Sequence, residues 1–274
     1  MRFRRAPRGF LRRPDLRRIA RWLLLLALLG SLAHAAEDPQ IAKRRAAERK
    51  TFTDAEVFQG FFATALGAEM RIAGRVDRIR KYDQPVRVYV ENHVKPDRGE
   101  QVAAVVADIR AKVEHLDIAM ATSREEANVV VRLLSERKFY PTLRQAFGRD
   151  RLRSIRKSLD PQCLSGFRKD AELRIVHSDV FLVADRGDFI FYDCAYEELL
   201  QSLGPINDTD KVPWTMFNDD VSMGFFDIYD QYILNILYHP RVRPGMARAE
   251  LRTLLPEIMP EVRAFVAKTN NLPR

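Results

Sequence analysis

Residues 193–218 read D-C-A-Y-E-E-L-L-Q-S-L-G-P-I-N-D-T-D-K-V-P-W-T-M-F-N, and this stretch decides how the rest of the chain is interpreted. Its first half has the spacing of an amphipathic helix, in which Glu197 and Gln201 stand four residues apart and share a face. Gly204 allows a left-handed helix end and a sharp turn. Asn207, three residues further on, can then return toward the helix. The stretch therefore predicts a helix, a turn and a polar cluster beside them.

The polar residues of this helix fall at the spacing of a zinc-protease motif, H-E-x-x-H-x-x-G-x-x-H. Glu198 occupies the position of the glutamate that activates the metal-bound water, and Gly204 that of the glycine. The three histidine positions hold Glu197, Gln201 and Asn207 instead. The pattern predicts the frame of a metalloprotease helix, with Glu198 as the candidate general base and without the usual zinc ligands.

Any metal at this helix would have oxygen ligands, from Glu197, Gln201 and Asn207, with Asp208 available next to them. Zinc prefers nitrogen and sulfur ligands and binds amides poorly, whereas calcium, magnesium and manganese suit such a set better. No two of the five histidines are spaced as a helical zinc pair; they are His34, His93, His115, His177 and His239. A standard zinc-protease site is excluded from this helix, and a different divalent metal stays open as a cofactor.

An ordinary amphipathic helix that ends at a glycine would show the same pattern, and this alternative stays open. Two features favour a site. A segment rich in predicted strands precedes the helix, and a loop with Met216 and then another helix follow it. A metzincin has this order, and its methionine turn forms the floor of the metal site. Met216 is therefore the candidate methionine of such a turn.

The net charge of +9 is concentrated at the N-terminus. Residues 1–35 hold nine arginines against one acid, Asp15, which accounts for +8 of the +9. In the remaining residues charges of both signs are interspersed. No basic footprint for nucleic acid is left there, so nucleic-acid binding is excluded as the main function.

The first residues resemble a secretory signal. An apolar run over 22–29 follows the arginines, and A-H-A at 33–35 has the A-x-A pattern of a cleavage site. We therefore predict a signal peptide over 1–35, a linker over 36–50 and one domain over 51–274. The run is shorter than the roughly 20 residues of a membrane span. The predicted location is the periplasm or the exterior, with no stable span after cleavage; an uncleaved anchor is the alternative.

Two cysteines lie in the predicted mature chain, Cys163 and Cys194. An even pair in an exported protein favours a disulfide. Such a bond would close a loop of about 30 residues and stabilise the fold by roughly 3 kcal/mol in the chain-entropy model. Two buried free thiols, or a metal-binding role for Cys194, are the alternatives.

Hydrophobic periodicity predicts an α+β domain with a mixed sheet and packed helices. The spacing of the Glu197 helix and the Met216 loop after it predict a zincin-like (metzincin-like) architecture for this domain. Thr53 to Glu56 form a capping box, T-x-x-E, and Ser165-Gly166 is typical of a turn. The last helix is expected to break near Pro256 and Pro260. The predicted helices cover 53–67, 100–114, 142–159, the Glu197 region, 225–238 and 247–268, and the predicted strands lie in 85–92, 127–134 and 172–184.

Four long motifs resemble an uncharacterised family of exported bacterial proteins, a domain of unknown function. The resemblance covers about 52–262 and rests on P-Q-C-L-S-G-F (161–167), D-C-A-Y-E-E-L-L-Q-S-L-G-P-I-N-D (193–208), V-P-W-T-M-F-N-D-D (212–220) and I-L-N-I-L-Y-H-P-R-V-R-P-G-M (233–246). It implies export and a shared fold, and it brings no established activity. The likeness of its core to a metzincin helix is an analogy.

Two function classes follow. The first is a non-catalytic envelope protein that keeps the cleft of a peptidase and binds a peptide or protein partner. A zincin receives an extended peptide by strand addition beside its helix, and the strand with His177 is expected there. The second is an active peptidase in which Glu198 is the general base, while Glu197, Gln201 and Asn207 or Asp208 hold an unusual metal. The missing histidines favour the first class.

Overall fold

The computed structural model describes residues 37–67, 77–158, 162–218 and 220–273, and the structural statements below concern these residues. The signal peptide predicted over 1–35 lies outside them. Within the described ranges, no helix combines the length and the apolar character needed to cross a membrane.

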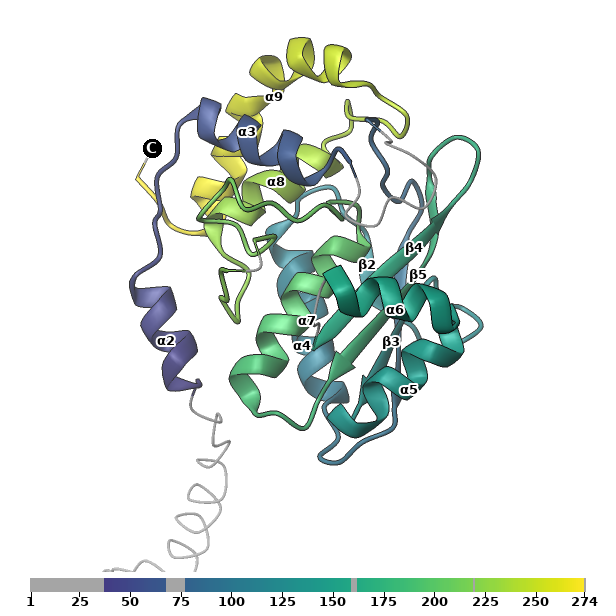
Figure 1. The fold of residues 1–274 in the computed structure, drawn as a ribbon. Coiled ribbons are helices and arrows are strands. Elements are labelled where there is room, and N and C mark those ends of the chain that lie inside the picture. The colour runs from purple at the N-terminus through teal and green to yellow at the C-terminus, as the bar shows by residue number, and fades with distance from the viewer. Residues whose placement is uncertain (1–36, 68–76, 159–161, 219, 274) are drawn as a thin grey trace, which may run out of the picture. The chain divides into compact units, whose positions relative to one another are not determined.

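The described elements form an α+β fold with one mixed sheet, as the sequence predicts (Figure 1). The helices are α2 (Pro39–Ala46), α3 (Asp54–Thr64), α4 (Gly99–Lys112), α5 (Glu136–Phe147), α6 (Arg149–Ser158), α7 (Asp188–Ser202), α8 (Ile228–Tyr238) and α9 (Arg248–Thr269). The strands are β1 (Val86–Asn92), β2 (Ile118–Met120), β3 (Val129–Leu134), β4 (Cys163–Lys169) and β5 (Ile175–Val183).

The five strands lie in the order β2-β1-β3-β5-β4. The neighbours β2–β1, β1–β3 and β3–β5 are parallel, whereas β4 runs antiparallel to β5 and forms an edge of the sheet. Because β4 and β5 follow each other along the chain, a short connection suffices for this pair, while the parallel pairs need crossovers. The edge strand β4 thus runs in the direction opposite to the other four strands.

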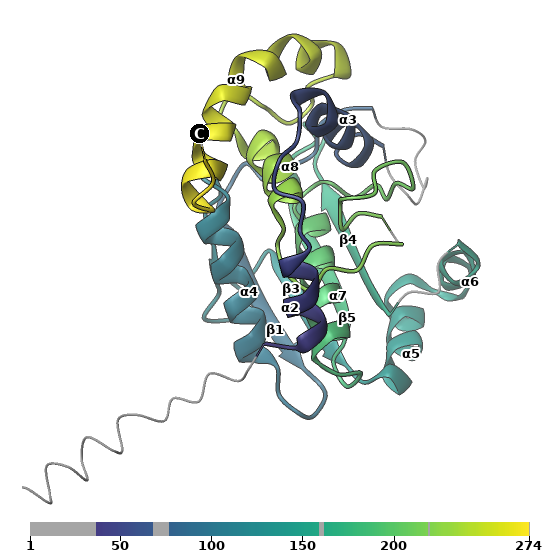
Figure 2. The ribbon, with the colours of Figure 1, turned by 90° about the vertical axis from the view of Figure 1, so that its left-hand side faces the viewer.

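Alternation along the strands gives the sheet two different faces. The face covered by α4 and α7 is a continuous apolar core, to which Val86, Val88 and Val180 contribute fully buried side chains. The opposite face has a smaller apolar cluster under α5 and α6, around Phe181 and Leu164. Figure 2 shows α5 and α6 on the side of the sheet away from α4.

Helices α3, α8 and α9 pack together and extend the main core beyond the sheet. All residues of α8 are buried, so it lies at the centre of this helical layer. Residues 36–50, predicted as a linker, contain α2, which begins at the cap residue Asp38 and buries Ile41. The carboxylate of Glu48 also accepts a hydrogen bond from the Ile228 N–H at 2.7 Å, at the start of α8.

Ser165 and Gly166 lie in the middle of β4, so the turn predicted there is wrong. Pairing with β5 overrides the local turn preference, because Leu164 and Ser165 are buried on opposite faces while the backbone follows the antiparallel ladder. Gly166 does not need the freedom of a glycine for a turn. Its position in the strand leaves an open space.

Two further predictions of helix limits are corrected. The helix predicted over 142–159 is a pair, α5 and α6, separated at Gly148, whose positive φ of 81° ends α5. The last helix, α9, continues through Pro256 and Pro260. Both prolines are exposed, so the carbonyl groups that lose an N–H partner can bind water, while an apolar stripe on the other side holds the helix to the core.

Candidate functional site

Helix α7 carries the predicted site residues along one stripe. Cys194, Glu198 and Gln201 stand at the spacing i, i+4 and i+7, so their side chains share a side of the helix, with Glu197 next to them. Two contacts show that this stripe faces the edge strand. Cys194 is bonded to Cys163 of β4, and the Gln201 side chain lies 3.5 Å from the hydroxyl of Ser165 in β4.

The disulfide Cys163–Cys194 confirms the prediction from the cysteine count. Both cysteines are almost fully buried, and their Cα atoms are 5.7 Å apart. The bond joins the start of the edge strand to the first half of α7. It therefore fixes the position of β4 relative to the stripe that contains Glu198 and Gln201.

Gly204 ends this part of the chain as the sequence predicts. Its φ is +141°, a conformation that residues with a side chain rarely adopt. A Cβ atom at this position would lie only 2.4 Å from the carbonyl oxygen of Arg80. Both conditions require glycine, and the resulting turn brings Asn207 back against α3, where its amide donates to the carbonyl of Ala63 at 2.7 Å.

Asp208 and Gln201 are bonded to each other. The Gln201 amide donates to a carboxylate oxygen of Asp208 at 2.6 Å, and Gln201 is only 6% exposed. Asn207 and Asp208 also line a pocket of about 520 Å³ between α3 and the loop that follows Gly204. The structure thus brings together three of the four predicted ligand residues, and it links two of them by a direct hydrogen bond.

The other predicted residues lie nearby in the chain and are placed differently. Glu198, the candidate base, is only 5% exposed, whereas Glu197 is half-buried. Met216 is buried in the loop between α7 and α8, and its N–H donates to Asp230 at 2.8 Å. Within the described parts of the chain, no group of three or more histidine, cysteine, aspartate or glutamate side chains has an arrangement that could hold a metal ion.

A pair of buried carboxyl groups, Asp227 and Asp230, anchors the Met216 loop. Asp227 is the N-cap of α8, and its side chain accepts from the Asp230 N–H at 3.0 Å. Asp230 in turn accepts from the hydroxyl of Thr215 at 2.5 Å and from the Met216 N–H. Burial raises the pKa of both carboxyl groups, and the charge of Asp230 raises that of Asp227 further.

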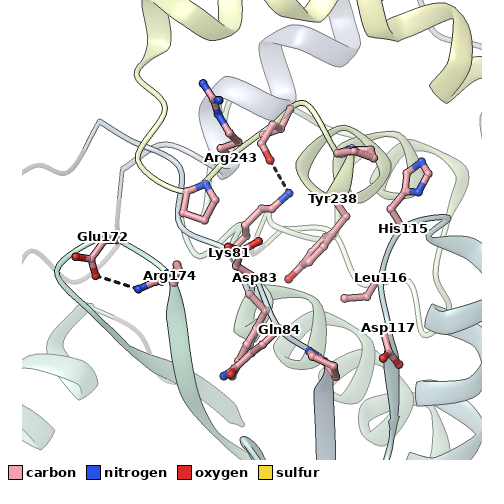
Figure 3. A pocket seen from close by; sticks show the side chains of 15 residues that line it. Lys81, Asp83, Gln84, His115, Leu116, Asp117, Glu172, Arg174, Tyr238 and Arg243 are labelled. Atoms are coloured by element: carbon pink, nitrogen blue, oxygen red, sulfur yellow. Dashed lines mark hydrogen bonds and ion pairs between the residues drawn. The ribbon is translucent and has the colours of Figure 1, made fainter.

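A larger pocket of about 720 Å³ opens where β1, β2 and β5 begin, next to the end of α8 (Figure 3). Lys81 lies at its inner wall, and its ammonium donates to the carbonyl groups of Leu237 and Val242 at 2.9 and 2.6 Å. Burial lowers the pKa of Lys81 to about 8. The Leu237 carbonyl belongs to the last turn of α8 and that of Val242 to the loop after it, so Lys81 caps the helix and joins it to this loop. The other charged lining residues have both signs; they are Asp83, Asp117, Glu172, Arg174 and Arg243.

Residues 54–257 match the family model described as "Protein of unknown function (DUF2927)". The chain belongs to this family. The membership predicted from the four motifs is thereby confirmed at the level of a family of unknown function. No curated protein and no solved structure matches the chain. The family covers β4, α7 and the Met216 loop, so the arrangement of edge strand, helix and loop lies inside its matched region.

Replacing Gln201 by leucine is expected to lower the free energy of unfolding by about 1 kcal/mol, because it removes the hydrogen bond to Asp208 while keeping the side-chain volume. Chemical denaturation measures this change. Gln59→Leu, at an exposed position of α3, is the control and should be neutral. A double-mutant cycle with Asp208→Leu should give a coupling energy of at least about 0.5 kcal/mol; additive effects would contradict the bond.

Proposed function

We propose that this chain is an exported binding protein that keeps the frame of a metzincin-like peptidase and takes up an extended peptide on the free edge of β4. The observation that supports this proposal most is that the edge strand β4 is attached to α7. The strand is fastened to the helix at Cys163 and Ser165, and its outer side has no partner strand among the described elements. An edge of this kind is a template for strand addition.

The register of β4 tells which backbone groups an added strand would meet. The N–H of Val183 donates to the carbonyl of Gln162, so residues 162, 164 and 166 of this ladder exchange hydrogen bonds with β5. In an antiparallel pair the residues between them direct N–H and C=O to the other side. Ser165 and Phe167 therefore present their backbone groups outward, and a bound peptide would pair with these two.

The bond between Gln201 and Asp208 supports binding without catalysis. In a metalloprotease of this frame, the residues at both positions would be free to approach the metal. Here the amide N–H of Gln201 is directed at the Asp208 carboxylate, at 2.6 Å. Because this amide and this carboxylate already form a hydrogen bond with each other, they need a cation between them less. The alternative, an active peptidase with Glu198 as base, requires this bond to open.

Export is part of the proposal, and the disulfide supports it, because such bonds persist in oxidising compartments. Cleavage after Ala35 would release the chain. The peptide or envelope protein that it binds is the expected partner.

The test measures hydrogen exchange of backbone amides in the purified, disulfide-bonded chain, with and without an excess of an extended β-prone peptide. We expect the amides of Ser165 and Phe167 to become protected, while those of Leu164 and Gly166, already bonded to β5, stay unchanged. Phe167→Pro should abolish binding because it removes an outward N–H. Phe167→Ala keeps this N–H and should retain binding.

Unchanged exchange at Ser165 and Phe167 under saturating peptide would overturn strand addition. Elemental analysis of protein purified without chelator separates the two function classes. We expect far less than one divalent metal per chain and no peptide cleavage. One bound metal per chain, together with cleavage that Glu198→Ala abolishes, would instead establish the peptidase.

A further inference from the structure

The sheet face opposite α7 has a third pocket, which lies beside the edge strand. His177 and Asp179 of β5 lie on this face, whereas Ser178 points to the other and bonds Tyr82, as alternation predicts. The pocket has a volume of about 520 Å³. Its wall includes both of these β5 residues, Gly166 and Arg168 of β4, and Phe147 at the end of α5.

Gly166 makes this pocket open to a neighbouring strand. A Cβ atom at this position would meet nothing within 4 Å, and no positive φ requires a glycine there. The missing side chain leaves a gap between Leu164, which is buried under α6, and Arg168, which is exposed. Cross-strand neighbours share a face of the sheet. A side chain of a strand added to β4 would therefore enter the gap at Gly166.

The charge of the pocket favours an anion. Its one lining acid, Asp179, is already paired with Arg132 at 2.7 Å and with His177 at 3.4 Å. Although burial opposes this charge, the hydrogen bonds from His177 and Arg132 lower the pKa of Asp179 to about 2. Arg168 makes no ion pair within the described residues, and its exposed side chain lines the pocket. It is available to a ligand.

Helices α5 and α6 strengthen this positive field. Among the residues of α5 and α6 whose side chains the structure describes, five are lysines or arginines and two are acids. The apolar sides of both helices are used inside the protein, because Phe139, Leu143 and Ile155 are buried in the cluster under them. Their apolar surface is thus occupied, which disfavours insertion into a lipid surface. Their exposed surface therefore offers a partner positive charge beside the edge strand β4.

We infer that the peptide which adds to β4 is acidic, and that the gap at Gly166 receives one of its carboxylate side chains, held by Arg168 and by the field of α5 and α6. This inference rests on the proposed strand addition. It selects the partner class, an extended segment with acidic residues at every second position, because only alternate side chains of a strand reach this face.

The experiment compares two fluorescent heptapeptides in anisotropy titrations with the purified, disulfide-bonded chain: one of alternating valine and glutamate, and its twin with glutamine for glutamate. The acidic peptide is expected to bind at least about tenfold more tightly, and its advantage should shrink as NaCl is raised. Arg168→Glu should remove this advantage. Arg110→Glu, the same charge change at an exposed position of α4, is the control and should retain it.

Gly166→Val tests the gap itself. The side chain has room and suits a strand, so the thermal midpoint should be kept or raised. Binding of the acidic peptide should fall to that of its twin, because valine occupies the gap. A folded Gly166→Val protein that retains full preference would overturn the inference.

The outcomes distinguish the inference from the function it rests on. Equal binding of both peptides, with protection of the Ser165 and Phe167 amides, would leave strand addition in place and overturn the acidic preference. Binding of neither peptide would overturn both. A third arm uses vesicles of phosphatidylglycerol and of phosphatidylcholine. Tight binding to the anionic vesicles that the acidic peptide does not displace would show a lipid surface as the target and would also overturn the inference.

Discussion

Replacing Cys163 and Cys194 by alanine together is expected to lower the free energy of unfolding by roughly 3 kcal/mol. The disulfide closes a loop with a sequence separation of 31, so its loss allows the unfolded chain many more conformations. Denaturation of the double variant, followed by circular dichroism, measures the change. The thermal midpoint should fall with it.

The loss of the disulfide should also destabilise β4 locally, in addition to lowering the free energy of unfolding of the whole domain. The bond joins an edge strand that pairs with β5 alone, so β4 loses its covalent link to α7 once the bond is cut. Hydrogen exchange at Leu164 and Gly166 should rise in the double variant before exchange in β1 and β3 does. Reductant should produce the same loss in the unmodified chain and no change in the double variant. Equal unfolding energies for both proteins would contradict a stabilising bond.

Asp227→Asn is expected to raise the free energy of unfolding near pH 7 by about 1 to 3 kcal/mol. This range is the usual cost of burying a polar group without a hydrogen-bond partner. Both carboxyl groups of the Asp227–Asp230 pair have raised pKa values, that of Asp230 about 6. The folded state therefore keeps protons that the unfolded state releases near pH 4. The stability that the pair contributes is complete below pH 4 and is lost as pH rises through the folded pKa values.

Asparagine at position 227 has a permanent N–H donor, so the pair no longer needs to bind a proton there. It also remains a good N-cap, whose oxygen can accept from the Asp230 N–H. The stability of the variant should thus depend less on pH between 4 and 7 than that of the parent, and the two should differ little at pH 4. Urea unfolding at several pH values measures this. Glu48, whose pKa burial also raises, accounts for part of the remaining slope.

Asp150→Asn is the control for this experiment, because the Asp150 side chain is 94% exposed and carries no comparable burial. It should leave the pH dependence unchanged. A parent-like slope in Asp227→Asn would show that the pair does not hold its proton in the folded protein. The result bears on the candidate site, since Asp230 holds the backbone of Met216.

Local patterns predicted much of the fold correctly. The 3.6-residue period predicted the helix that contains Glu197, Glu198 and Gln201, and the alternation of Val86 and Val88 predicted β1 and its buried face. The capping box at Thr53 is present. These features depend on neighbours a few residues away, so the sequence shows them directly.

Several of the errors involve partners distant in the chain. Ser165-Gly166 resembles a turn until β5 is beside it, and β2 is too short to show a period. The same holds for the site. The spacing grouped Gln201 with Asp208, but nothing in it indicates that the two bind each other. The raised pKa values of the carboxyl pair at the start of α8 could not be predicted, because they depend on complete burial, which only the packed structure supplies.

The arrangement of β4 and β5 has a consequence for how the protein assembles. Residues 170–174 connect them, whereas β1 and β3 can pair only after α4 and β2 have crossed over. Short loops close faster than long ones, so this hairpin should form early in folding. Its outer side would then be exposed in a partly folded chain, when self-association is most dangerous. Arg168 and Lys169 at the end of β4 would repel the same basic edge of a second chain, which limits self-association.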